Sequence, residues 1–111
     1  MTITEETHDR THVLLLSGRL DGSTCDALGA RIEALAAAGR TQVLLDCGAL
    51  TYVSSAGLRV LIVGAKRTKA AGGSLSCCQL QPMVRQVFDL SGFGAILPVH
   101  ADRASALKAL G

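Results

Sequence analysis

The sequence predicts an α/β domain with a mixed, mainly parallel sheet of about five strands and about four helices, and two observations carry this prediction. Two strand-like segments open the chain with only a short turn between them, and stretches of helical periodicity then alternate with short apolar runs up to a final helix. The chain has 111 residues, of which 49% are apolar, mostly Ala, Leu and Val. We therefore expect residues 1–111 to form one domain around an aliphatic core.

The first two expected strands form a hairpin over residues 2–8 and 12–16, with Asp9 and Arg10 as its turn. Residues 12–16 are apolar without alternation, which is typical of a strand buried on both faces. We expect this strand to end at the segment 18–22, which contains two glycines and an aspartate.

Two longer helices are predicted from apolar side chains that recur at three- and four-residue steps. The first follows a cap at Ser23 and ends at Gly39. Its apolar stripe consists of Cys25, Leu28, Ile32 and Leu35. The second runs from about Ser55 to Ala71, where Gly72 and Gly73 end it. Its buried face consists of Leu58, Leu61, Ile62 and Ala65.

The remaining elements alternate in the same way. Short strands are expected at residues 42–46, 74–80 and 96–99. Pro82 suits the first position of a helix that closes near Gly92. The last helix is expected from about Asp102 to Leu110, with Leu107 and Leu110 buried.

Composition argues against several classes of protein. A formal net charge of +2 and only three aromatic residues argue against direct nucleic-acid binding. No segment approaches the roughly 18 apolar residues of a membrane span, and the N-terminus lacks a basic start, so we expect a soluble cytoplasmic protein without membrane contact. No cysteine pair has the C-x-x-C spacing of a metal site, so we expect no bound metal. We also expect no cofactor. The thiols should be small buried groups in a protein of a reducing compartment. The four cysteines are Cys25, Cys47, Cys77 and Cys78, and the last two should point to opposite faces of their strand.

Two adjacent serines lie where the strand at 42–46 gives way to the central helix. Ser54 suits the N-cap, where its hydroxyl accepts a hydrogen bond from a free backbone N–H. Ser55 then lies in the first turn with its hydroxyl directed outward, where a phosphate would meet the positive helix end. Capping alone also explains a Ser-Ser pair before a helix, so the spacing leaves both interpretations open.

A second segment is expected near these serines. Asp21 follows the end of one predicted strand, as Ser54 and Ser55 follow the end of another. The carboxyl ends of parallel strands meet at one edge of a sheet, and ligands and partners bind there. We therefore expect Asp21 and the two serines to form a single surface.

These segments carry a resemblance that covers nearly the whole chain. Asp46 lies at the end of the predicted strand 42–46, and further along the chain comes Tyr52-Val53-Ser54-Ser55-Ala56-Gly57-Leu58-Arg59-Val60-Leu61. Upstream lies Gly18-x-Leu20-Asp21, and downstream lie Gly72-Gly73-x-Leu75 and Leu80-x-Pro82-x-Val84-Arg85-x-Val87-Phe88-x-Leu90-Ser91-Gly92-Phe93. Together they resemble the STAS domain of bacterial anti-sigma factor antagonists, which implies a STAS-like single layered domain.

The resemblance implies a switch without catalysis. In the family, the unphosphorylated antagonist binds a serine-kinase anti-sigma factor and so frees a sigma factor. Phosphorylation of one serine by that kinase ends binding, and a PP2C-type phosphatase restores it. The acceptor corresponds to Ser55. Ser54 occupies the position where well-studied members have Asp, and this departure makes Ser54 the alternate acceptor. Asp21 matches the family's acidic residue at the partner-facing loop. The expected partner-binding residues are Asp21, Ser54, Ser55, Ala56, Gly57 and Arg59.

Three alternatives remain open. The serine turn is similar to a G-x-S-x-G nucleophile elbow but lacks its first glycine, and His100 is the only histidine placed by its edge position to assist an enzyme. Domains resembling this one also act as small-ligand or lipid-transport accessory modules, although no phosphate-cradling G-x-x-x-x-G-K-[ST] pattern is present. The third alternative is an interaction domain in which neither serine is modified. We expect no enzyme activity, and a monomer.

Overall fold

A computed structural model describes residues 1–110, and its secondary structure follows the predicted order. The elements are β1 (Thr2–His8), β2 (Thr11–Leu20), α1 (Cys25–Ala37), β3 (Gln42–Val53), α2 (Ser55–Ala70), β4 (Ser74–Cys78), α3 (Pro82–Leu90), the short 3-10 helix η1 (Phe93–Ala95), β5 (Val99–His100) and α4 (Arg103–Leu110). The 3-10 helix was not expected from the sequence.

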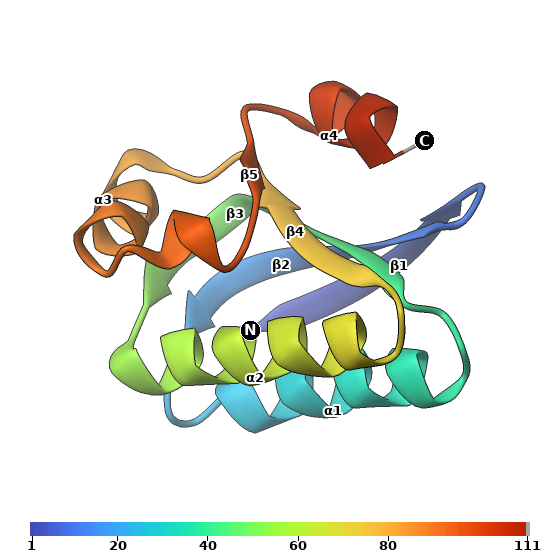
Figure 1. Cartoon of the computed structure of the whole chain (residues 1–111). Coiled ribbons are helices and arrows are strands. Elements are labelled where there is room, and N and C mark those ends of the chain that lie inside the picture. Colours follow the sequence, from blue (N-terminus) through green and yellow to red (C-terminus); the bar gives the residue numbers. More distant parts are fainter. Residues whose placement is uncertain (111) are drawn as a thin grey trace.

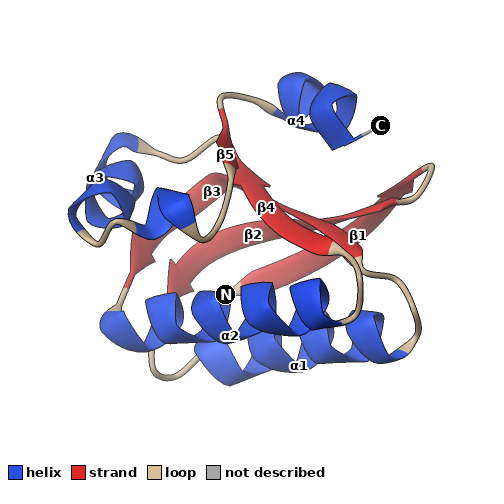
Figure 2. Cartoon of the chain, viewed as in Figure 1, coloured by secondary structure: helices blue, strands red, loops and turns tan. Residues whose placement is uncertain are grey.

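The sheet has the strand order β1-β2-β3-β4-β5. β1 and β2 are antiparallel and every other neighbouring pair is parallel, which confirms the mixed, mainly parallel sheet. Helices α1 and α2 lie side by side under one face of the sheet, and α4 lies over the other (Figure 1). Helix α3 and η1 lie beyond the sheet, at the end where β3 leads into α2 (Figure 2). Helices α1, α2 and α4, which were predicted from the sequence, thus form layers on the two faces of the sheet.

The core is divided by the sheet into a large and a small part. Leu14 and Leu16 of β2 face α1 and α2 in the large part, because alternate residues of a strand point to opposite faces. The small part lies beneath α4 and consists of Val13, Leu44, Cys78 and Ala106. Leu107 and Leu110 were expected to be buried, yet they are only half-buried against this small part. These apolar contacts by themselves therefore hold α4 only weakly against the sheet.

Strands β2 and β3 are longer than the sequence predicted. Their apolar runs end near residues 16 and 46, but the two strands stay paired up to Leu20 and Val53, across two register shifts. Exposed small and polar residues such as Gly48, Ala49 and Thr51 interrupt the apolar pattern there without interrupting the ladder. The serine turn therefore follows a long strand directly.

The last strands are shorter than predicted. β4 ends at Cys78 because Gln79 adopts a positive φ of 59°, which breaks the extended conformation. β5 contains only Val99 and His100. Residues 96 and 97 were expected to belong to it, but both donate their backbone N–H groups to the Phe93 carbonyl instead.

The cap of α1 also differs from the prediction. The N-cap residue is Thr24, and no side chain caps this helix. The predicted cap, Ser23, donates its hydroxyl to Asp21 Oδ1 at 2.7 Å. The stripe of Cys25, Leu28, Ile32 and Leu35 is buried as expected.

All four cysteines are buried free thiols. Cys77 belongs to the large part of the core and Cys78 to the small part, which confirms their opposite orientation. Burial, with the negative charge of nearby Asp46, raises the pKa of Cys78 to about 12. The Cys78 thiol is therefore protonated at neutral pH, and it packs as a small apolar group.

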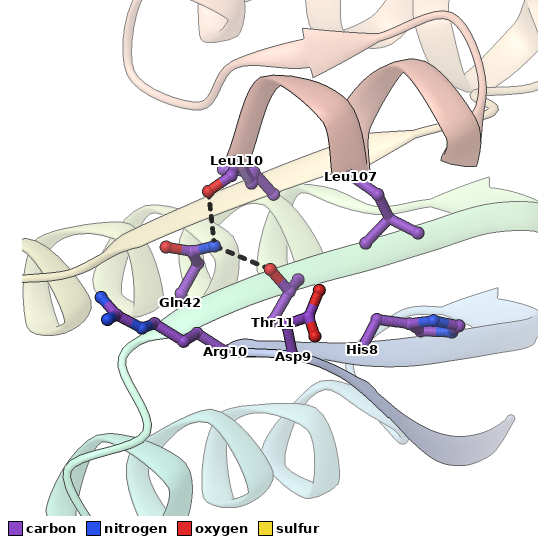
Figure 3. Close-up of a pocket in the computed structure, with 7 residues that line it drawn as sticks. All are labelled: His8, Asp9, Arg10, Thr11, Gln42, Leu107 and Leu110. Atoms are coloured by element: carbon purple, nitrogen blue, oxygen red, sulfur yellow. Dashed lines mark hydrogen bonds between the residues drawn. The ribbon is translucent and has the colours of Figure 1, made fainter.

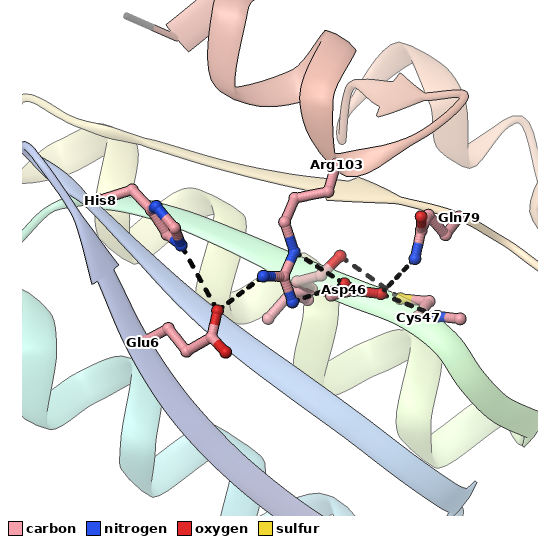
Figure 4. Close-up of polar contacts among 8 residues, drawn as sticks. Glu6, His8, Asp46, Cys47, Gln79 and Arg103 are labelled. Carbon is pink, nitrogen blue, oxygen red and sulfur yellow. Dashed lines mark hydrogen bonds and ion pairs between the residues drawn. The ribbon is translucent and has the colours of Figure 1, made fainter.

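A buried ion pair connects α4 to the sheet (Figure 4). Asp46 was expected at a strand end, but it lies within β3 and is only 7% exposed. Its Oδ2 accepts from Arg103 Nη2 at 3.0 Å and from Nε at 3.1 Å. Its Oδ1 accepts from Gln79 Nε2 at 2.9 Å and from the Gly48 N–H at 3.0 Å. Arg103 Nη1 also donates to Glu6 Oε2 at 2.6 Å, so a single guanidinium joins α4 to β1 and β3.

Candidate functional site

The predicted site lies where β2 and β3 end side by side. Leu20 pairs with Val53, and the next residue, Ser54, donates its N–H to the Leu20 carbonyl at 2.9 Å. Asp21 directly follows Leu20. The structure thus confirms that Asp21 and the two serines share one edge of the sheet.

The cap of α2 is formed as predicted. Ser54 has extended backbone angles, and its Oγ accepts a hydrogen bond from the Gly57 N–H at 3.1 Å. Ser55 is the first residue of the helix, and it is exposed. The Ser54 hydroxyl oxygen is therefore engaged in the fold, whereas the Ser55 side chain is open to solvent.

Gly57 is buried beneath the end of β2 and does not form part of the surface. A Cβ at this position would lie 2.8 Å from the Leu20 carbonyl oxygen and 2.9 Å from Leu20 Cγ. Only a glycine lets α2 begin this close to β2. Gly57 therefore positions the serine turn against the Asp21 loop.

Asp21 is held rigidly by its own loop. Its Oδ1 accepts from the Ser23 hydroxyl at 2.7 Å, from the Ser23 N–H at 3.0 Å and from the Thr24 hydroxyl at 3.3 Å. The two hydrogen bonds from Ser23, side chain first and then backbone, lower the pKa of Asp21, with a smaller contribution from Thr24. The carboxylate is therefore negatively charged at neutral pH and fixed in direction.

Two further residues at this edge were not assigned a role from the sequence. The Arg19 guanidinium stacks on the Tyr52 ring, 4.1 Å from its centroid, and Arg19 Nε lies 3.7 Å from Asp21 Oδ2. Arg19 and Tyr52 are partners in the β2–β3 register. Only this register brings them together, so the spacing in the sequence contained no signal for the contact.

The other predicted site residues lie along α2. Ala56 is half-buried and Arg59 is exposed. Arg59 follows Ser55 by four residues, so both lie on one side of the helix. Arg59 also lines a groove of about 410 Å³ between α1 and α2, opposite Asp26. The cap of α2 is Ser54, and the first turn of α2 contains no acidic residue.

The structure does not bring His100 to the serines. His100 pairs with Cys78, whose partner in β3 is Asp46, and Asp46 precedes Ser54 by eight residues of the chain. At about 3.3 Å per residue, the intervening strand spans roughly 25 Å. His100 therefore does not lie beside the serine turn, as the base of a nucleophile elbow would have to.

Within residues 1–110, no group of three or more His, Cys, Asp or Glu side chains is arranged to hold a metal ion. None of the helices in the described part of the chain combines the length and apolar character needed to cross a bilayer.

This arrangement defines a class of small α/β domains that place a capped serine turn and a fixed carboxylate at the carboxyl ends of two neighbouring parallel strands. The chain belongs to the STAS domain family: the family described as "Mlab, STAS domain" matches residues 3–98. BtrV of Bordetella bronchiseptica is 38% identical to it over 109 residues, which cover 98% of this chain and 94% of that protein.

Three solved structures show the same fold. The crystal structure of an anti-sigma factor antagonist from Mycobacterium paratuberculosis has a TM-score of 0.88 at 27% identity, with 98% of this chain and 92% of the other covered. The anti-sigma factor antagonist SpoIIAA in its unphosphorylated form has a TM-score of 0.81 at 23% identity, with 97% and 96% covered. Bacillus SpoIIAA has also been solved in a phosphorylated form, with a TM-score of 0.77, 23% identity, and 99% and 100% covered.

Proposed function

We propose that this protein is an anti-sigma factor antagonist controlled by phosphorylation of Ser55. The unphosphorylated form binds a serine-kinase anti-sigma factor through Asp21, the serine turn and Arg59, and so releases a sigma factor. The kinase ends this binding by phosphorylating Ser55, and a PP2C-type phosphatase restores it. The observation that carries the proposal is the exposed Ser55 side chain beside the rigid Asp21 carboxylate on one sheet edge. Relatives named for the same activity support it.

The local geometry favours Ser55 over Ser54 as the acceptor. A kinase must reach the hydroxyl oxygen, and Ser54 is half-buried with its Oγ accepting a hydrogen bond from the Gly57 N–H. Phosphorylation of Ser54 would also disturb the cap, and loss of a serine cap typically costs about 1 kcal/mol. Ser55 has neither constraint.

The proposed switch acts by charge and desolvation. A phosphate adds about −1.5 to −2 charges at neutral pH. Like charges brought together at an interface, and phosphate removed from water, each oppose binding. Ser55 already sits in a regular first turn, so the modified side chain does not require the domain to refold.

Mapping the phosphate tests the acceptor. Purified from its own host, the protein is expected to carry one phosphate, which fragmentation by mass spectrometry places on Ser55. Ser55→Ala should lose it. Ser54→Asp should keep it, because Asp also caps a helix. A phosphate on Ser54 would move the acceptor by one residue. Its absence, even from phosphatase-deficient cells, would contradict the switch and favour an unmodified interaction domain or a ligand-binding module.

Binding to the kinase tests the consequence. Ser55→Asp is expected to weaken binding to the cognate kinase at least about tenfold, because it adds a negative charge at the interface. Ser55→Ala should bind and stay bound in the presence of ATP, which isothermal titration and gel filtration can follow.

Ser105→Asp is a matched control for this measurement. Ser105 is exposed in the first turn of α4, on the other face of the sheet, and the substitution adds the same charge. Its affinity should equal that of the unmodified protein. Equal affinities for Ser55→Ala and Ser55→Asp would contradict the proposal.

A further inference from the structure

A second polar site lies at the opposite edge of the sheet, at the amino ends of the parallel strands. A pocket of about 400 Å³ opens there between the β1–β2 turn and the loops that follow α1 and α2. Arg10 comes from the turn, Arg40 from the loop after α1, and His12 from the start of β2. Among the described residues, no acidic side chain lines it. Three residues that carry or can carry positive charge thus converge from three segments.

His12 is the buried side chain of this pocket. It is only 8% exposed, and strand alternation places it on the same face as Leu14, beneath the ends of α1 and α2. Its Nδ1 lies 3.5 Å from Thr7 Oγ1. Its Nε2 has no hydrogen-bond partner among residues 1–110, and it is not among the polar atoms sealed from solvent. The unpartnered nitrogen therefore keeps some contact with solvent, and His12 lines the pocket.

The surroundings leave the positive charge uncompensated. Neither Arg10 nor Arg40 forms an ion pair within the described part of the chain. Asp9, the neighbour of Arg10, lines an adjacent pocket that Arg10 lines as well, and Figure 3 shows the Arg10 side chain there extending away from His8.

The helix ends do not cancel this charge either. Helices end with exposed carbonyl groups that repel anions. Here, however, the N–H groups of Gly39 and Arg40 already bond to carbonyls of α1, and those of Gly72 and Gly73 bond to carbonyls of α2. The last-turn carbonyls are thus largely paired within their own loops.

We propose that this pocket binds a phosphomonoester, with the guanidinium groups of Arg10 and Arg40 on its oxygens and the His12 Nε2–H as a third donor. Arginine pairs well with phosphate oxygens because its planar N–H groups match their geometry. When the Thr7 hydroxyl donates to Nδ1, Nε2 carries the proton and points a donor at the ligand. The site lies across the sheet from Ser55 and does not depend on that serine being modified.

Inorganic phosphate is the first probe. We expect its titration into the labelled protein at pH 7, at ionic strength held constant with sodium chloride, to shift amide NMR signals of residues 10–12, 39–42 and 72–73. The shifts should saturate with a dissociation constant in the low millimolar range or below. Shifts that rise linearly without saturation, or that chloride alone reproduces, would overturn the proposal.

Variants locate the site. Arg10→Gln and Arg40→Gln should each weaken binding at least about fivefold, because each removes charge-assisted hydrogen bonds. Both side chains are exposed, so the fold should survive. Arg85→Gln, an exposed arginine on α3, is the control and should bind as the parent does. Unchanged affinity in both pocket variants would refute the assignment.

Two further probes distinguish a soluble phosphomonoester from a lipid headgroup as the ligand. Saturable binding of glycerol 3-phosphate at the same amides would assign a soluble ligand. Binding to phosphatidylcholine vesicles only when they contain phosphatidic acid, with loss in Arg40→Gln, would assign a lipid headgroup. Binding to neither would overturn the proposal.

Discussion

Replacing Arg103 by methionine is expected to lower the free energy of unfolding by about 3–5 kcal/mol. Asp46 is almost completely buried, and Arg103 supplies the only cation within hydrogen-bonding distance of its carboxylate among residues 1–110. Without it, Asp46 retains hydrogen bonds from Gln79 and Gly48 but no compensating charge. An unpaired buried carboxylate is among the most costly defects a fold can carry.

Urea unfolding followed by circular dichroism at pH 7 measures this loss. The matched control is Arg31→Met, because Arg31 pairs with Glu5 at 2.9 Å where both side chains are exposed. Such a surface pair is worth at most about 1 kcal/mol. The double variant Asp46→Asn with Arg103→Met should recover much of the loss, since it removes both charges. A loss in Arg103→Met as small as in Arg31→Met would show that the buried pair does not hold α4.

The same ion pair shows why the sequence placed Asp46 wrongly. A carboxylate after Val-Leu-Leu indicates a strand end, because a lone charge is expensive to bury. Its partner Arg103 lies 57 residues later, and no local pattern connects the two. The positions of the helices were predicted well for the opposite reason. Their signals are local, as in the Ser54 cap and the stripe of α1.

The candidate site likewise contains residues that local sequence patterns indicated and contacts that depend on tertiary structure. The sequence alone indicated Ser54 as a cap and Ser55 as an outward side chain, and parallel-sheet geometry brought Asp21 to the same edge. The stacking of Arg19 on Tyr52 depends on the β2–β3 register, which includes two shifts. The pocket around His12 depends on three turns meeting in space. Contacts of these kinds follow from tertiary structure and leave no trace in spacing.

Substituting Gly73 by alanine is expected to cost about 3 kcal/mol of stability, at the upper end of what overpacking usually costs. A methyl group at Gly73 would overlap both the carbonyl oxygen and the Cβ of Thr41. Thr41 cannot yield by rotating a side chain, because its carbonyl accepts the Ser74 N–H at 2.9 Å where β3 and β4 begin to pair. The backbone itself must move.

Thermal and urea unfolding of Gly73→Ala test this, with Gly22→Ala as the control, since a methyl group at Gly22 would meet nothing within 4 Å. The control should change stability by less than about 0.5 kcal/mol, as surface substitutions usually do. The displaced backbone in Gly73→Ala also borders the pocket that Arg40 and His12 line. The variant should therefore weaken phosphate binding there while leaving phosphorylation of Ser55, at the far edge of the sheet, unchanged in the folded fraction. Wild-type stability in Gly73→Ala would mean that the two loops are not packed as closely as the structure shows.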